Sequence, residues 1–159
     1  MQILLRHVLF VVLFAAAIPS FAQQINDSLL ARVARRFEEV QHLSLQKIIQ
    51  PTAVGIGQVP NNEILPCYSG MQVTVVAIFN SKPVDAYGRM LVAKHYPTST
   101  QYDEHLFQET GYDNTFKINY ALISVYFPPN ATYRNCNTTL QVYDKKQLSN
   151  KVWLIVLTK

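Results

Sequence analysis

The spacing of apolar residues changes near residue 51, and this change restricts the chain to folds that combine a helix with β-strands. In residues 26–50 apolar side chains recur every three or four positions, which is typical of one face of an amphipathic helix. This stripe consists of Leu30, Val33, Phe37 and Val40. The sequence Asn-Asp-Ser at 26–28 offers N-cap side chains, and Pro51 prevents continuation. We therefore predict a helix over residues 26–50.

Five later segments have the composition and alternation of β-strands: residues 71–79, 89–96, 115–127, 138–143 and 151–158. The loop between the first two is too short for a parallel crossover, so we expect an antiparallel connection there. The last two are expected to form a closing hairpin. Residues 115–127 become apolar on both faces, which predicts a central strand. Residues 98–110, followed by Gly111, fit a short helix.

These elements predict an α+β fold in which one N-terminal amphipathic helix packs on an antiparallel sheet of about five strands. A β-sandwich with an appended helix is the alternative.

Residues 1–22 have the pattern of a secretory signal peptide. Arg6 precedes an apolar run over residues 8–18, and Pro19 and the small residues Ser20 and Ala22 follow it. The run is too short to cross a hydrocarbon core of about 30 Å as a helix, so we expect cleavage after Ala22 and no stable membrane anchor. Removal of these 22 of the 159 residues leaves 137, enough for a single globular domain over residues 23–159. The predicted location is secreted or periplasmic.

The charge of the chain offers little attraction for nucleic acid. There are 14 Lys and Arg against 10 Asp and Glu, and loss of Arg6 with the signal peptide leaves a net charge of +3. The arginines at positions 32, 35 and 36 are followed directly by Glu38 and Glu39, which gives a mixed surface rather than a basic patch. We therefore expect no nucleic-acid partner.

The two cysteines, Cys67 and Cys136, are predicted to form one disulfide. An exported chain meets an oxidising compartment, in which paired thiols persist. Neither cysteine has a Cys or His partner at zinc-ligand spacing. Closing a loop of about 70 residues would stabilise the fold by roughly 4 kcal/mol. A free thiol and an intermolecular bridge are the alternatives.

Residues 128–139, PPNATYRNCNTT, combine two prolines, Cys136 and two N-glycosylation sequons. Proline cannot continue an interior strand, so this segment is predicted to be the turn that ends the central strand. The candidate glycosylation sites are Asn130 and Asn137, with Asn26 as a third. They carry sugar only in a eukaryotic secretory pathway.

The richest polar cluster is YDEHLFQETGYD over residues 102–113, in which His105 and Glu109 would share one face of the predicted short helix. A metal site needs three or four converging ligands, and His95 is a further donor from the preceding strand. Carboxylates in a first helical turn also stabilise the helix N-terminus, so a capped surface helix is the simpler interpretation. Because the chain has no Gly-x-Ser-x-Gly nucleophile motif either, we predict no metal and no cofactor, and we favour a non-enzymatic role over catalysis.

The nine tyrosines all follow the signal peptide. A tyrosine presents a flat apolar ring and a polar tip, which suits a glycan or an extended peptide. Tyr96, Tyr120 and Tyr126 are the candidates for a binding face, because strand alternation alone explains them least. The simpler interpretation is that tyrosine is favoured on half-buried strand faces.

Together these features predict an exported, non-enzymatic binding protein that recognises a protein or a glycan through one face of its sheet or the loops at one end. The first alternative is a secreted hydrolase or metalloprotein that uses the region of His105 and Glu109. The second alternative is an inhibitor of a secreted hydrolase.

Overall fold

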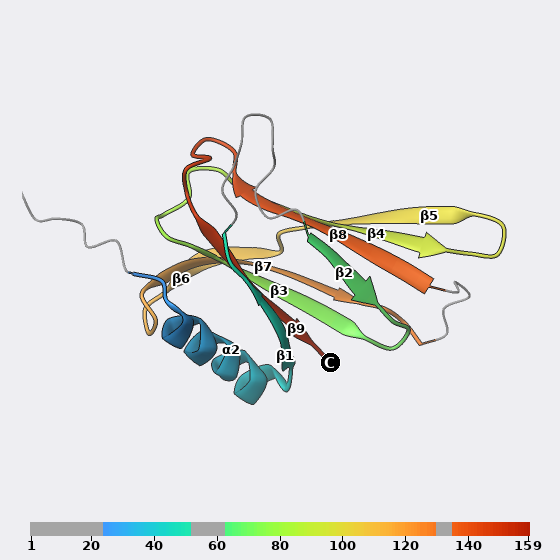
Figure 1. The fold of residues 1–159 in the computed structure, drawn as a ribbon, viewed down its shortest axis with the longest axis horizontal. Coiled ribbons are helices and arrows are strands. Elements are labelled where there is room, and N and C mark those ends of the chain that lie inside the picture. The colour runs from blue at the N-terminus through green and yellow to red at the C-terminus, as the bar shows by residue number, and fades with distance from the viewer. Residues whose placement is uncertain (1–23, 52–62, 130–134) are drawn as a thin grey trace, which may run out of the picture.

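The computed structural model describes residues 24–51, 63–129 and 135–159, and in these ranges it contains one α-helix and nine β-strands. The helix, α2, spans Asp27–Gln41. The strands form two antiparallel sheets, here called sheet A and sheet B (Figure 1). Sheet A has the order β1 (Ser44–Ile49), β9 (Val152–Thr158), β3 (Gln72–Phe79), β7 (Ile118–Tyr126) and β6 (Glu109–Asp113). Sheet B has the order β2 (Glu63–Cys67), β8 (Asn135–Asp144), β4 (Ala86–His95) and β5 (Thr100–Leu106).

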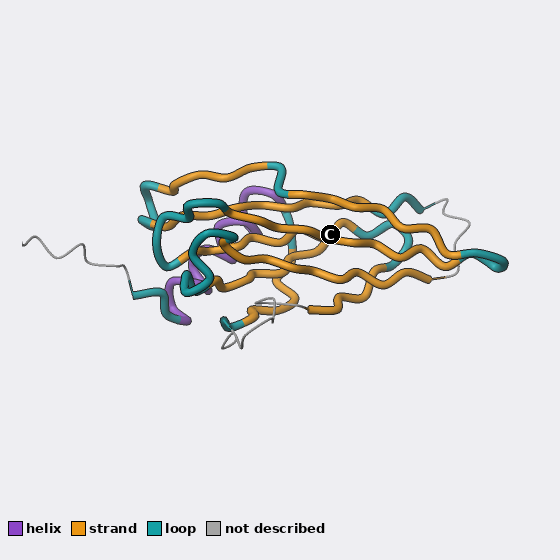
Figure 2. The backbone as a smooth tube through the Cα atoms, turned by 90° about the horizontal axis from the view of Figure 1, so that it is seen from above, coloured by secondary structure: helices purple, strands orange, loops and turns teal. Residues whose placement is uncertain are grey.

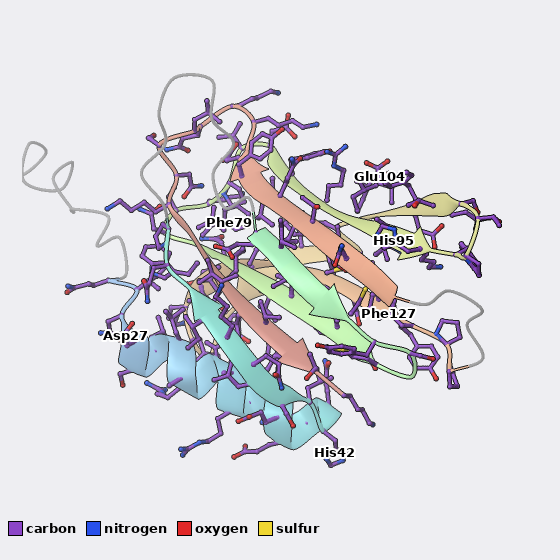
Figure 3. All side chains as sticks on the ribbon, turned by 45° about the vertical axis from the view of Figure 1, so that its right-hand side comes forward. Asp27, His42, Phe79, His95, Glu104 and Phe127 are labelled. Atoms are coloured by element: carbon purple, nitrogen blue, oxygen red, sulfur yellow. The ribbon has the colours of Figure 1, made fainter. Side chains whose placement is uncertain are left out.

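The helix begins where the sequence predicts and ends earlier. Asn26 is the N-cap, and its side chain accepts a hydrogen bond from the backbone N–H of Leu29 at 2.9 Å. His42 adopts a left-handed conformation with φ of 54°, which ends the helix, and Figure 3 shows it at that end. The prediction of helix over residues 26–50 is therefore wrong for its last third, which forms β1 instead.

The two sheets are joined by a large apolar cluster, called here the inter-sheet core. It includes Val75 and Ala77 of β3 together with Met90, Val92 and Leu140 of sheet B. Figure 2 shows that the strands run along the long dimension of the molecule.

A second apolar cluster, called here the helix-side core, joins α2 to three strands of sheet A. Leu30 and Val33 of α2 share it with Val76 of β3, Ile118 of β7 and Ile155 of β9. Because β3 and β9 contribute alternate residues to the two cores, both of their faces are buried and their sequences are almost continuously apolar. Burial of a large aliphatic side chain contributes about 1.5–3 kcal/mol, so these two strands hold the molecule together.

The coarse prediction of one helix with antiparallel β-structure is confirmed. A single sheet of about five strands is wrong, because nine strands form two sheets. The observed architecture is closer to the alternative, a β-sandwich with an appended helix.

All five predicted strands are present with shifted ends, as β3, β4, β7, β8 and β9. Two predicted connections are wrong. β3 and β4 belong to different sheets, and so do β8 and β9, so neither pair forms a hairpin. Short loops that pass from one sheet to the other have the same length as hairpin loops, and the sequence pattern does not separate them. The strand predicted to be central, β7, lies between β3 and β6.

The predicted short helix over residues 98–110 is wrong. This segment forms β5, which pairs with β4 from Arg89 opposite Leu106 to His95 opposite Thr100, and the beginning of β6. Pairing with β4 supplies the backbone hydrogen bonds that the helix would have supplied. Among the described residues, no helix has the length and apolar character to span a membrane.

Candidate functional site

A groove lies between α2 and the half of sheet A formed by β6 and β7, with a volume of about 230 Å³. Most of its lining is apolar: Val33, Phe37 and Val40 on the helix, and Val76, Ile118 and Leu122 on the sheet. Its polar lining includes Arg36, Glu109, Asp113 and Tyr120. The first half of α2 packs into the helix-side core, and its second half, from Val33 to Gln41, forms the helix wall of the groove.

The helix wall of the groove contains an apolar residue that the fold does not bury. Val40 belongs to the apolar stripe that predicted the helix, yet 59% of its surface is exposed. Val33, on the same stripe, is only 2% exposed. The helix therefore extends its apolar face past the core and into the groove, where it has no covering partner within the described part of the chain.

The opposite wall is organised by Tyr120. Its hydroxyl donates a hydrogen bond to Oε1 of Glu109, and its ring end lies 3.1–3.2 Å from the position that a Cβ on Gly111 would occupy. The hydrogen bond to Glu109 is the main reason that the pKa of Tyr120 is raised, with burial and the charges of Glu109 and Asp113 adding to it. The tyrosine stays protonated and holds the Glu109 carboxylate at the groove.

Asp113 closes the end of β6. Its Oδ1 accepts hydrogen bonds from the backbone N–H groups of Thr115 and Phe116 at 2.7 and 2.9 Å, and Lys117 follows in a left-handed conformation. The Arg32 guanidinium lies 5.5 Å from the centre of the Phe116 ring, a cation–π distance. Among the described residues, neither Glu109 nor Asp113 is in an ion pair, so this wall carries two carboxylates, and Arg36 lies on the helix wall of the groove.

The three tyrosines proposed as one binding face do not lie together. Tyr96 packs against the inter-sheet core, whereas Tyr120 packs against the helix-side core. Tyr126 lies on the same face of β7 as Tyr120, because alternation separates them by an even number of residues, and it is 59% exposed. Of the three, only Tyr120 lines the groove.

His105 and Glu109 do not share a helix face, which corrects the geometry that the sequence predicted for them. His105 lies on β5 of sheet B, and Glu109 lies on β6 of sheet A. His95 ends β4, and Figure 3 shows it on the hairpin arm away from α2. The described residues contain no group of three or more side chains placed to hold a metal.

Cys67 lies directly opposite Cys136 in the pairing of β2 with β8 and is not a free cysteine. Facing residues of an antiparallel pair have Cα atoms about 4.5–5.5 Å apart, which is within the range a disulfide needs. Cys136 and Asn137 belong to β8 and not to the turn predicted over residues 128–139. Asn137 is exposed, Asn26 is engaged as the helix cap, and Asn130 lies outside the described residues, as do residues 1–22 with the predicted signal peptide.

Sequence reasoning missed the groove. Val40 and Phe37 belong to the predicted apolar stripe, but Glu109 on the opposite wall falls in the helix predicted over residues 98–110, where the structure has the beginning of β6. The alternation of Glu109, Gly111 and Asp113 on one face of a short strand was the available signal. Comparison of the chain with protein-family models, curated proteins and solved structures found no match.

Proposed function

We propose that this chain is an exported, non-enzymatic binding protein that recognises a protein partner through the groove between α2 and β6–β7. The observation that carries the proposal is the apolar wall of the groove, where the exposed Val40 and the lining residue Phe37 continue the buried stripe of the helix. Apolar surface that a fold leaves uncovered beside a polar rim is characteristic of interaction sites.

The size and lining of the groove favour a protein over a small ligand or a glycan. Its volume of about 230 Å³ is below the roughly 300–1,000 Å³ of sites that enclose drug-sized molecules. It suits one or two inserted side chains. A glycan would require more hydrogen-bonding groups than the aliphatic floor formed by Val76, Ile118 and Leu122 supplies.

The carboxylates of Glu109 and Asp113 add a charge preference. Each accepts hydrogen bonds from its own neighbourhood, and neither is in ion-pair contact with a cation among the described residues, although Arg36 lies on the helix wall of the same groove. A partner segment with a large apolar side chain next to Lys or Arg would match the groove in both shape and charge.

The first prediction concerns Val40. We expect Val40→Lys to weaken binding tenfold or more, because it places a charge in the apolar wall, while the fold is kept since the side chain is already exposed. The probe is a set of peptides selected on the wild-type protein from a phage-displayed library of random linear peptides. Binding is measured by calorimetry with the synthetic peptides.

Val84→Lys is the matched control, since Val84 is 64% exposed against 59% for Val40 and does not line the groove. It should bind the selected peptides as the wild type does. Equal binding by Val40→Lys and Val84→Lys, or a selection that enriches no peptide, would remove the groove as the recognition site.

A further inference from the structure

The four edges of the two sheets are not equivalent. An exposed sheet edge invites pairing with another chain, and proteins block it with bulges, prolines or charges that point inward. β1 has a register shift between Leu45 and Lys47, and β2 contains Pro66. On β5, Asp103 and His105 lie opposite the core residues Val92 and Met90, so charged or titratable groups lie on its inward face.

β6 lacks a proline, a register shift between Glu109 and Asp113, and a charge on its face toward sheet B. Its two charged residues, Glu109 and Asp113, lie on the opposite face, in the groove beside α2. Its pairing with β7 is regular from Glu109 to Asp113, and its sequence ETGYD contains neither proline nor lysine. The residues of β6 on the face toward sheet B, Thr110 and Tyr112, are uncharged and exposed. No described strand pairs with its outer side. Among the described edges, β6 is therefore the one that is open to another strand.

The hydrogen bonds of sheet A show which backbone groups of β6 are free to pair. Phe127 donates its N–H to the carbonyl of Met71 at 2.8 Å, so the odd-numbered residues of β7 pair with β3. The even-numbered residues of β7 then face β6, where their partners are Glu109, Gly111 and Asp113. The N–H and C=O groups of Thr110 and Tyr112 consequently point away from the sheet.

The open edge and the groove are parts of one surface. Glu109 and Asp113 belong to β6 and also line the groove, and Gly111 between them leaves room for the Tyr120 ring. A strand added beside β6 would place every second side chain on the same face as these carboxylates. That arrangement suits an extended segment with an apolar and a basic residue two positions apart, so that both face the groove.

We propose that β6 receives an extended segment of a partner protein as an additional strand of sheet A, with its main chain paired to Thr110 and Tyr112 and an apolar side chain in the groove. This inference rests on the proposed function and specifies how the partner is bound. Main-chain pairing supplies affinity, and the groove with its carboxylates selects the side chains.

The second prediction tests the main-chain pairing. Thr110→Pro removes an N–H that points outward, so β6 keeps its bonds to β7, and the selected peptides should bind tenfold or more weakly. Thr100→Pro is the matched control, because Tyr96 donates its N–H to the Ser99 carbonyl at 2.8 Å, which places the N–H of Thr100 on the open edge of β5. This control should bind normally. Backbone amide exchange at Thr110 and Tyr112, followed by NMR, should slow at least tenfold when a peptide is bound.

The outcomes separate the two proposals. If Thr110→Pro binds normally while Val40→Lys does not, the groove is the recognition site and strand addition is wrong. If both variants bind normally, both proposals are wrong. Weak binding by Thr110→Pro together with unchanged exchange at Thr110 and Tyr112 also contradicts strand addition. A dimer that Thr110→Pro dissociates in sedimentation would assign the edge to a second copy of this chain and overturn the partner-protein proposal.

Discussion

Asp144 is the buried charge on which two loops depend. Its side chain is completely buried and accepts hydrogen bonds from the backbone N–H groups of Val84, Asp85, Lys146 and Gln147, and from Nδ2 of Asn150. Burial by itself raises the pKa of Asp144, but the hydrogen bonds from Val84 and Asp85, from Asn150 and from Lys146 together hold the pKa below its usual value. The carboxylate ties the loop after β3 to the loop after β8.

The third prediction follows from these hydrogen bonds. Asp144→Asn should lower the free energy of unfolding at pH 7 by about 2–4 kcal/mol, because bonds to a charged acceptor are lost and an amide N–H faces backbone donors. The folded pKa is depressed, so this contribution is present above the unfolded pKa of about 3.9 and is lost as the pH falls through the folded value. The difference between wild type and variant should therefore shrink on acidification below about pH 4.

Urea unfolding at a series of pH values measures this difference, with Asp85→Asn as the control. The control removes a neighbouring carboxylate and should change stability by less than about 0.5 kcal/mol. An Asp144→Asn variant as stable as the control at pH 7 would contradict the assigned role.

The fourth prediction concerns Gly88 on β4. A Cβ at this position would lie 2.3 Å from Cζ of Phe107, whose ring packs against the inter-sheet core. Gly88→Ala should destabilise the protein by about 1–3 kcal/mol, because the ring must leave its packed position. Gly111→Ala should cost less, since the nearest atom is the exposed hydroxyl end of Tyr120 at 3.1 Å. A lower melting temperature for Gly111→Ala than for Gly88→Ala would contradict this expectation.

At the scale of elements, the sequence predicts features that depend on neighbouring residues, but not those that depend on the pairing of distant segments. The cap at Asn26 and the alternation of β3 appear in the sequence because each depends on neighbouring residues. The end of α2 was not predicted for two reasons. His42 adopts a left-handed conformation, which histidine does not require, and the residues after it pair with β9 as β1. That pairing joins segments about a hundred residues apart, and no local pattern encodes it.

The groove could not be predicted for the same reason. Its walls come from α2 and from β6 with β7, so residues such as Val40 and Glu109 are brought together only by the packing of the helix on the edge half of the sheet. The sequence predicts a short helix with capping carboxylates over residues 98–110. This segment instead forms β5 and the beginning of β6, in different sheets, because edge positions tolerate exposed polar side chains.

At the scale of the whole molecule, the fifth prediction is a disulfide between Cys67 and Cys136. The register that places them opposite each other would let a bridge fasten β2 to β8 without displacing either strand. The mass of non-reduced protein should be two hydrogens below that of the thiol form, and reduction should lower stability by up to about 4 kcal/mol. Free thiols in the folded, non-reduced protein would show that the pair does not form.

The most direct test of recognition in the groove is hydrogen–deuterium exchange of the whole protein with and without a selected peptide, followed by mass spectrometry. Protection should appear in α2 over residues 33–41 and in residues 109–122 of β6 and β7, and exchange in β4 and β5 of sheet B should not change. Protection confined to β4 and β5 would place the binding surface on sheet B and contradict the proposed function.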